Sequence, residues 1–185
     1  MNRIYKHVWN KKQGRYVVAS EIARANGPSK SSVVVGLILS GLIGAVNVFA
    51  QAVAPNALPT NPTVTSGDAS FNSTTNKLTI NQTSDKLITN WGGFNIGSGA
   101  AVQFVQPSST STALNRVIST DPSYIEGSLS ANGKVILINP NGVVFSNGAR
   151  VDAAGIVAST LNLSDQNFLQ DQFIFEKNGV AGSIT

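Results

Sequence analysis

Short runs of strand-forming residues, separated by turn formers, fill residues 71–185 and constrain the fold more than any other feature of the chain. Val, Ile, Thr and Phe gather in these runs, and clusters of Gly, Asn, Asp and Ser lie between them. Apolar residues almost never recur at helical spacing, so the pattern predicts an all-β domain.

The runs place the expected strands, and one polar stretch places the expected helix. We expect strands at residues 77–80, 86–91, 101–107, 114–119, 134–139, 142–146 and 155–160. The segment LSDQNFLQDQF is the one expected helix, with Ser164 capping its N-terminus and with Phe168 and Leu169 facing inward.

Two β architectures are compatible with these strands. The three Asn-Gly pairs at 132–133, 141–142 and 147–148 could each close an antiparallel hairpin. Against hairpins, KVILI and GVVF are continuously apolar and lack the alternation of a sheet with one wet face. Short strands joined by sharp glycine corners, with each turn stacked on the last, explain these runs better. A coil of about 20 residues would give five or six coils in residues 71–185, with Val135, Ile136 and Ile138 buried.

Positive charge is concentrated in the first fifty residues. Residues 1–50 hold seven of the thirteen Lys and Arg and one of the nine acidic residues, a net charge of +6. The remainder has six basic and eight acidic residues, a net charge of −2. Removal of the first fifty residues would therefore leave no basic patch, which argues against nucleic acid as a partner.

The first fifty residues have the order of a signal peptide. Basic residues precede the apolar run VVVGLILSGLIGAV, and Val48-Phe49-Ala50 has the small-residue pattern that signal peptidase reads. We expect a helical signal peptide cleaved between Ala50 and Gln51. The alternative is a membrane anchor, because residues 33–50 approach the lower limit of about 17 residues for a spanning helix.

The chain is expected to have three parts. Residues 1–50 form the cleaved signal peptide, residues 51–70 form an extended lead-in that contains prolines, and order begins near Phe71 in a domain that covers residues 71–185. The chain has no cysteine, so its stability must come from backbone ladders and a packed interior.

The composition argues against most enzyme classes. The single histidine, His7, lies in the signal peptide, and without cysteine the remainder cannot build Ser-His, Cys-His or ordinary zinc sites. Asp121, Glu126 and Asp152 could serve carboxylate chemistry, but their spacing defines no pair. We expect no enzyme, no cofactor and no metal site.

Two stretches carry resemblances to known families. MNRIYKHVWN, followed by YVVASE and an Ala-Arg-Ala step, resembles the extended signal peptide region of very large exported bacterial proteins. ANGKVILINPNGVVF, followed by GARVDAAGIVASTL, resembles the secretion domain of two-partner secretion exoproteins, which include filamentous haemagglutinins, haemolysins and contact-dependent inhibition proteins.

The second resemblance implies a fold, a partner and a location. It implies a right-handed, single-stranded parallel β-helix that engages an outer-membrane β-barrel transporter. It also implies passage through the inner-membrane secretion machinery, cleavage by signal peptidase, and secretion or surface display by a Gram-negative bacterium. Host or competitor cell surfaces would be reached through a region beyond Thr185. A separate carbohydrate-binding or carbohydrate-cleaving β-helix is the alternative.

The family's secretion motif falls on Asn139, Pro140, Asn141 and Gly142. The ring of Pro140 fixes its own φ and favours an extended Asn139, whereas Asn141 and Gly142 tolerate positive φ. Val143 stands where the family often has isoleucine, and the family's NPNL tetrapeptide is absent. The chain ends on NGVAGSIT, which resembles the opening of another coil and favours a fragment or a truncated gene product.

Overall fold

The computed structural model describes residues 6–10, 15–19, 53–179 and 181–185, and the chain divides into the units Met1–Phe49 and Ala50–Thr185. In the first unit, β1 (Lys6–Asn10) and β2 (Arg15–Ala19) form an antiparallel pair. These two segments are strands, so the helix expected of the signal peptide is not found in them. The apolar run and the cleavage site between Ala50 and Gln51 lie outside the described residues.

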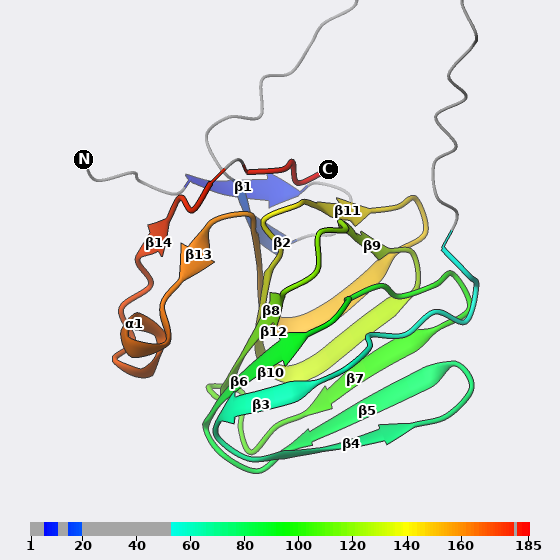
Figure 1. Ribbon diagram of the computed structural model, residues 1–185, viewed down its shortest axis with the longest axis horizontal. Helices are drawn as coiled ribbons and strands as arrows, with labels where there is room; N and C mark the ends of the chain where they lie inside the picture. The colour runs from blue at the N-terminus through cyan, green and yellow to red at the C-terminus, as the bar shows by residue number, and fades with distance from the viewer. Residues whose placement is uncertain (1–5, 11–14, 20–52, 180) are drawn as a thin grey trace, which may run out of the picture. The chain divides into compact units, whose positions relative to one another are not determined.

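The second unit is a parallel β-helix of about four turns (Figure 1). Its coils are built from β5 (Lys77–Gln82), β6 (Lys86–Trp91), β7 (Ala101–Val105), β8 (Thr112–Val117), β9 (Ser123–Ile125), β10 (Ser128–Ile138), β11 (Val143–Phe145) and β12 (Arg150–Ser159). The coils stack along three sides. On the first side β5, β7 and the first halves of β10 and β12 pair in parallel. On the second side β6, β8 and the second halves of β10 and β12 pair in parallel. The third side carries the parallel pair β9 and β11. The stacked architecture is therefore confirmed.

The coils are longer and fewer than the sequence suggested. Lys77 pairs with Ala101, Ala101 with Ser128, and Ser128 with Arg150, and these partners mark the start of each successive coil on the first side. Every one of these intervals exceeds the coil length assumed from the sequence. The expectation of five or six coils is wrong because the corners are longer than assumed and because residues 162–176 leave the coil path.

The three Asn-Gly pairs are corners. Asn132 and Gly133 lie at a register shift within β10, where the strand crosses from the first side to the second. The pair at 141–142 precedes β11, and the pair at 147–148 precedes β12, and both of these strands pair in parallel with the coil before them. Asn-Gly here turns a chain that continues forward, so the hairpin alternative is wrong at all three positions.

An antiparallel cap closes the N-terminal end of the helix. β3 (Thr63–Ser66) runs antiparallel to β6, and β4 (Ala69–Ser73) runs antiparallel to β5. Order therefore begins before Phe71, inside the segment expected to be an extended lead-in. The turn between the two strands needs Gly67, whose φ is +78°. The cap covers strand edges that would otherwise be open to pairing with another chain.

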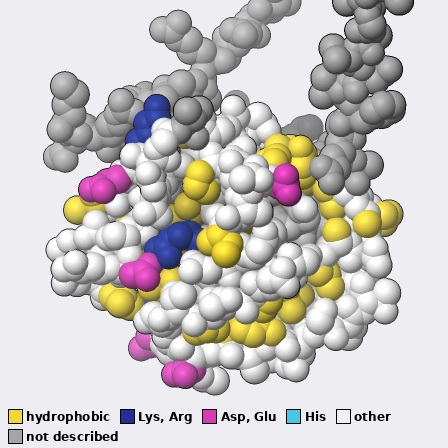
Figure 2. Space-filling view, viewed as in Figure 1, with side chains coloured by type: hydrophobic (Ala, Val, Ile, Leu, Met, Phe, Trp, Pro, Cys, Tyr) yellow, Lys and Arg dark blue, Asp and Glu magenta, His cyan; other side chains and the backbone are white. Residues whose placement is uncertain are grey.

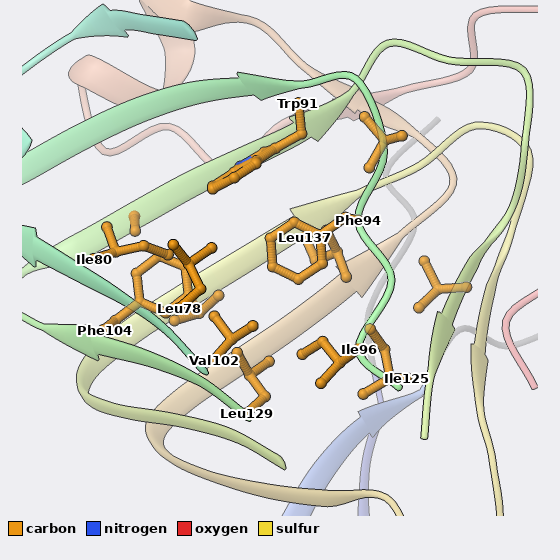
Figure 3. Packing of buried hydrophobic residues seen from close by; sticks show 14 of the residues in the cluster. Leu78, Ile80, Trp91, Phe94, Ile96, Val102, Phe104, Ile125, Leu129 and Leu137 are labelled. Atoms are coloured by element: carbon orange, nitrogen blue, oxygen red, sulfur yellow. The ribbon is translucent and has the colours of Figure 1, made fainter. Parts of the chain in front are cut away.

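The interior of the coils is a column of apolar side chains (Figure 3). Trp91 is fully buried, with the rings of Phe71 and Phe94 edge-on to it at centroid distances of 5.6 Å and 5.3 Å. Phe71 thus joins the cap to the core. Each buried Leu, Ile, Val or Phe is worth about 1.5 to 3 kcal/mol, so the column is the main source of stability.

A segment after β12 covers the outer face of the second side. We call residues 162–176 the clip; it comprises β13 (Asn162–Leu163), α1 (Asp165–Leu169) and β14 (Phe175–Glu176). The Ser164 hydroxyl accepts a hydrogen bond from the Asn167 backbone N–H, and Phe168 is fully buried, so the predicted cap and inward ring are confirmed. The inward placement of Leu169 is wrong, since 44% of it is exposed.

The clip explains why residues 135–138 are continuously apolar. Val135 faces the interior of the coils, whereas Ile136 and Ile138 face outward and pack under the clip. All three are buried, as predicted, but in two separate clusters. A strand covered on both faces needs no polar alternation.

Candidate functional site

The corner formed by residues 139–142 is a β-turn between coils. The Gly142 N–H donates to the Asn139 carbonyl at 3.1 Å, and Pro140 occupies the second position, which its fixed φ favours. Gly142 has a φ of +122°, whereas among the described residues only Asn61 and Asp171 are non-glycine residues with positive φ. Gly142 is thus the one residue of the corner with positive φ, which glycine adopts without strain, and Asn141 lies outside the left-handed region.

The Asn139 side chain holds the corner in place through buried hydrogen bonds. It is fully buried, and its amide donates to the Asp121 carbonyl and to Ser123 Oγ, each at 3.0 Å. Its Oδ1 accepts from the Asn141 backbone N–H at 2.9 Å. Its own N–H donates to the Ser159 carbonyl at 3.0 Å, so Asn139 links its coil to the one before and the one after.

Asn141 is the part of the corner that reaches solvent. Its side chain is exposed, yet its amide donates to the Ser119 carbonyl at 2.8 Å and lies 3.3 Å from Asn139 Oδ1. Pro140 beside it is half-buried. The corner therefore presents an amide and a proline ring whose positions are set before any partner arrives.

The last residues of the chain pack on the other flank of the corner. The Gly182 N–H donates to the Pro140 carbonyl at 2.7 Å, and the Val143 N–H donates to the Ser183 carbonyl at 3.0 Å. A Cβ at Gly142 would lie 3.0 Å from the Ser183 carbonyl oxygen. A side chain at Gly142 is thus opposed both by its φ and by this neighbour.

The partners of Asn139 were missed at the level of sequence. Asp121 and Ser123 hold the Asn139 amide through a carbonyl and a hydroxyl, yet they lie 18 and 16 residues earlier in the chain. The coil repeat is the only signal that could have found them, because it brings residues about one coil apart into contact.

The carboxylates considered for catalysis lie apart. Asp121 and Glu126 flank the two ends of β9 on the third side, whereas Asp152 lies on β12 and pairs in register with Ser130 of β10. Within the described ranges, no group of three or more His, Cys, Asp or Glu is placed to hold a metal ion. The chemistry that the corner offers is hydrogen bonding by amides and backbone carbonyls.

Residues 50–184 match the family described as TPS secretion domain. The chain belongs to the two-partner secretion family. Residues 1–50 match a second family, the extended signal peptide of type V secretion systems. Both resemblances seen in the sequence are therefore confirmed.

Relatives in Haemophilus influenzae support the same assignment. The chain is similar to two heme/hemopexin-binding proteins of this organism: it is 39% identical to one over 134 residues and 48% identical to the other over 90 residues. These matches cover 72% and 49% of the chain but only 14% and 10% of the relatives, so the chain spans a small part of their length.

A solved structure agrees with the fold. The chain resembles the crystal structure of the HMW1 secretion domain from Haemophilus influenzae with a TM-score of 0.65 and 36% identity. The match covers 68% of this chain and 34% of that one. This two-partner secretion domain is thus a β-solenoid similar in fold to the HMW1 secretion domain.

Family membership carries a location and a class of partner. The signal peptide and the secretion domain mark a protein that crosses the periplasm of a Gram-negative bacterium and is secreted or held at the cell surface. Secretion domains of this family engage an outer-membrane transporter. In the described part of the chain, no helix has the length and apolar character to span a membrane.

Proposed function

We propose that the corner at Asn139, Pro140, Asn141 and Gly142 is the element that the transporter's periplasmic part reads. The observation that carries this proposal is the Asn141 amide, which is exposed but held by Ser119 and by the buried Asn139. A partner that binds a preformed turn does not have to immobilise it, and this lowers the entropic cost of binding.

The β-helix then supports recognition by holding the turn. Asn139 has hydrogen-bond partners in the coils before and after its own, so the contacts that hold the corner come from three stacked coils. We propose that recognition of the corner and growth of the β-helix are coupled for this reason. The role is recognition and nucleation of folding rather than catalysis.

The signal peptide is proposed to be removed between Ala50 and Gln51. The two family matches meet at residue 50 and the first structural unit ends at Phe49, which supports a boundary there. Inner-membrane secretion machinery and signal peptidase would act on this segment before the outer membrane is reached.

Contacts with host or competitor cells are proposed to lie elsewhere in a larger exoprotein. The relatives named for heme and hemopexin binding are much longer than their matched parts, which cover 14% and 10% of them. The described residues of this chain supply the secretion end of such a protein.

Export of corner variants tests the proposal. The exoprotein carrying Gly142→Val or Asn139→Ala is co-expressed with its transporter, and the periplasmic and extracellular amounts are compared. The matched control is Gly148→Val, because Gly148 also has positive φ (+110°) but a Cβ there would have no atom within 4 Å. All three variants should lose some stability, because valine is disfavoured at the positive φ of Gly142 and Gly148 and because Asn139→Ala removes buried hydrogen bonds.

The expected result is a loss of export for the two corner variants and parental export for Gly148→Val. If Gly142→Val and Asn139→Ala are folded and exported at the parental level, the corner is only a structural turn. Equal losses in all three variants would show that export follows stability and not the identity of the corner.

A further inference from the structure

Two cations from adjacent coils hold the two ends of α1 in the clip. Near its N-terminal end, Arg116 of β8 donates to the Leu163 carbonyl at 2.6 Å and to Asp165 Oδ1 at 2.5 Å. At its C-terminal end, Lys86 of β6 donates to the Leu169 carbonyl at 2.6 Å and pairs with Asp171 at 2.9 Å. Figure 2 shows basic and acidic side chains beside one another, among apolar ones, on this side of the molecule.

Beneath the clip lies a row of apolar side chains. Ile88, Leu114, Ile136 and Val157 share one register across the four coils and point outward. The clip covers this row with Leu163 and Phe168, both of which are fully buried. Without the clip, the second side of the β-helix would show a continuous apolar surface.

The clip is attached by side chains and not by the ladder of the coils. β13 and β14 pair with each other as a separate two-stranded sheet of two residues each, and α1 has five residues. Segments with few buried contacts open locally at lower free energy than the core does. Because β13 and β14 pair with each other and with no described strand of the coils, the clip can open while the ladders of the coils stay intact.

The apolar row leads to the corner already described. Ile138, which lies under the clip, directly precedes Asn139. Ile118 continues the outward-facing positions of Leu114 and Arg116 beyond the clip, is 68% exposed, and adjoins Ser119, whose carbonyl Asn141 binds. Covered and uncovered apolar residues thus form one surface that ends at the proposed recognition turn.

We propose that the clip opens as a unit and that the surface it bares, together with Ile118, is a second contact surface for the transporter's periplasmic domain. This rests on the proposed function, because the surface is assigned to that partner through its continuity with the corner. A chain that forms its coils from the N-terminal side has most of the row before it has the clip. The surface is then free while the partner holds the chain, and the clip covers it afterwards.

Hydrogen exchange on the full chain tests the opening by itself. The probes are the Phe168 and Gln170 amides of the clip, compared with the ladder amides of β8 and β10. Arg116→Ala should speed exchange in the clip about tenfold, the effect of removing a charge-assisted hydrogen bond, and leave the ladder unchanged. Lys134→Ala is the control, since Lys134 is an exposed cation on the same side and forms no ion pair among the described residues. Clip amides that exchange only as slowly as the ladder would overturn the opening.

Binding to the purified periplasmic domain of the transporter tests the contact surface. The binding-competent form is the one whose clip is open, and apparent affinity scales with the fraction of chain in that form. Arg116→Ala raises this fraction about tenfold, so it should bind the periplasmic domain about tenfold more tightly. Ile118→Ser should bind several-fold more weakly with unchanged exchange. Equal or weaker binding by Arg116→Ala, or no effect of Ile118→Ser, would refute the surface even if Asn139→Ala shows that the corner is needed. If only the export test gives the refuting result, with Gly142→Val and Asn139→Ala exported at the parental level, the proposed function is wrong but the exchange result still holds.

Discussion

Replacing Asn139 by Ala should destabilise the secretion domain by a predictable amount. The side chain is fully buried and makes three hydrogen bonds of 2.9 to 3.0 Å, to the Asp121 carbonyl, Ser123 Oγ and the Asn141 N–H. A typical buried hydrogen bond contributes about 1 kcal/mol net, and a partner left unsatisfied costs about 1 to 3 kcal/mol. The free energy of unfolding should therefore fall by about 3 kcal/mol, which is a large share of the roughly 5 to 15 kcal/mol typical of a domain.

Urea denaturation followed by circular dichroism measures this loss, and Asn115→Ala provides the matched control. Asn115 is also fully buried; it accepts from Trp91 Nε1 at 3.0 Å and donates to two backbone carbonyls at 3.3 Å, but it lies inside the coils. Both variants should lose similar stability, with a melting temperature lower by roughly 10 °C. Only Asn139→Ala should also lose export. A loss for Asn139→Ala of only about 0.5 kcal/mol or less, as for an ordinary surface substitution, would refute the bonding argument.

Three further outcomes are expected. Val135→Asp should unfold the domain, because it places an unpaired charge at a position that is 1% exposed. Ile118→Asp, at a position that is 68% exposed, should change the free energy of unfolding by less than about 0.5 kcal/mol. Melting curves of both variants measure this difference. Phe71→Ala should lower the free energy of unfolding by about 2 kcal/mol, because the half-buried ring joins the cap to Trp91, and a loss near zero would mean that the cap is not coupled to the core. N-terminal sequencing of exported protein should begin at Gln51, and a chain that kept Met1 would favour the membrane anchor.

The fold class could be predicted from the sequence because the signals for strands and turns are local. Continuous apolar runs such as 135–138 and turn pairs such as Asn141-Gly142 indicate strand and corner directly. The number of coils could not be predicted from the sequence, because the length of each corner depends on how the loops pack between coils. The N-terminal cap was missed because Thr63–Ser66 is short and follows prolines, and it becomes a strand only through pairing with β6.

The candidate site was predictable in identity but not in construction. The motif at 139–142 and its rigid turn could be seen in the sequence, whereas the bonds from Asn139 to Asp121 and Ser123 depend on the coil register. Likewise, nothing local indicates that Ile136 and Ile138 face outward under the clip. Leu163 and Phe168 cover these two isoleucines. They lie beyond the next coil in the chain, so only tertiary packing brings them over Ile136 and Ile138.

Site-specific photo-crosslinking during secretion can show directly whether the transporter binds the corner at residues 139–142. A photoreactive residue is placed at Asp121 or, as a control, at Asn147, since both side chains are exposed. Asp121 contacts the corner through its backbone carbonyl, which accepts from the Asn139 amide, so a probe there leaves the Asn141 amide in place. We expect a crosslink to the transporter's periplasmic domain from position 121 and little or none from position 147. No crosslink from position 121, or equal crosslinking from both positions, would contradict recognition of this corner by the transporter.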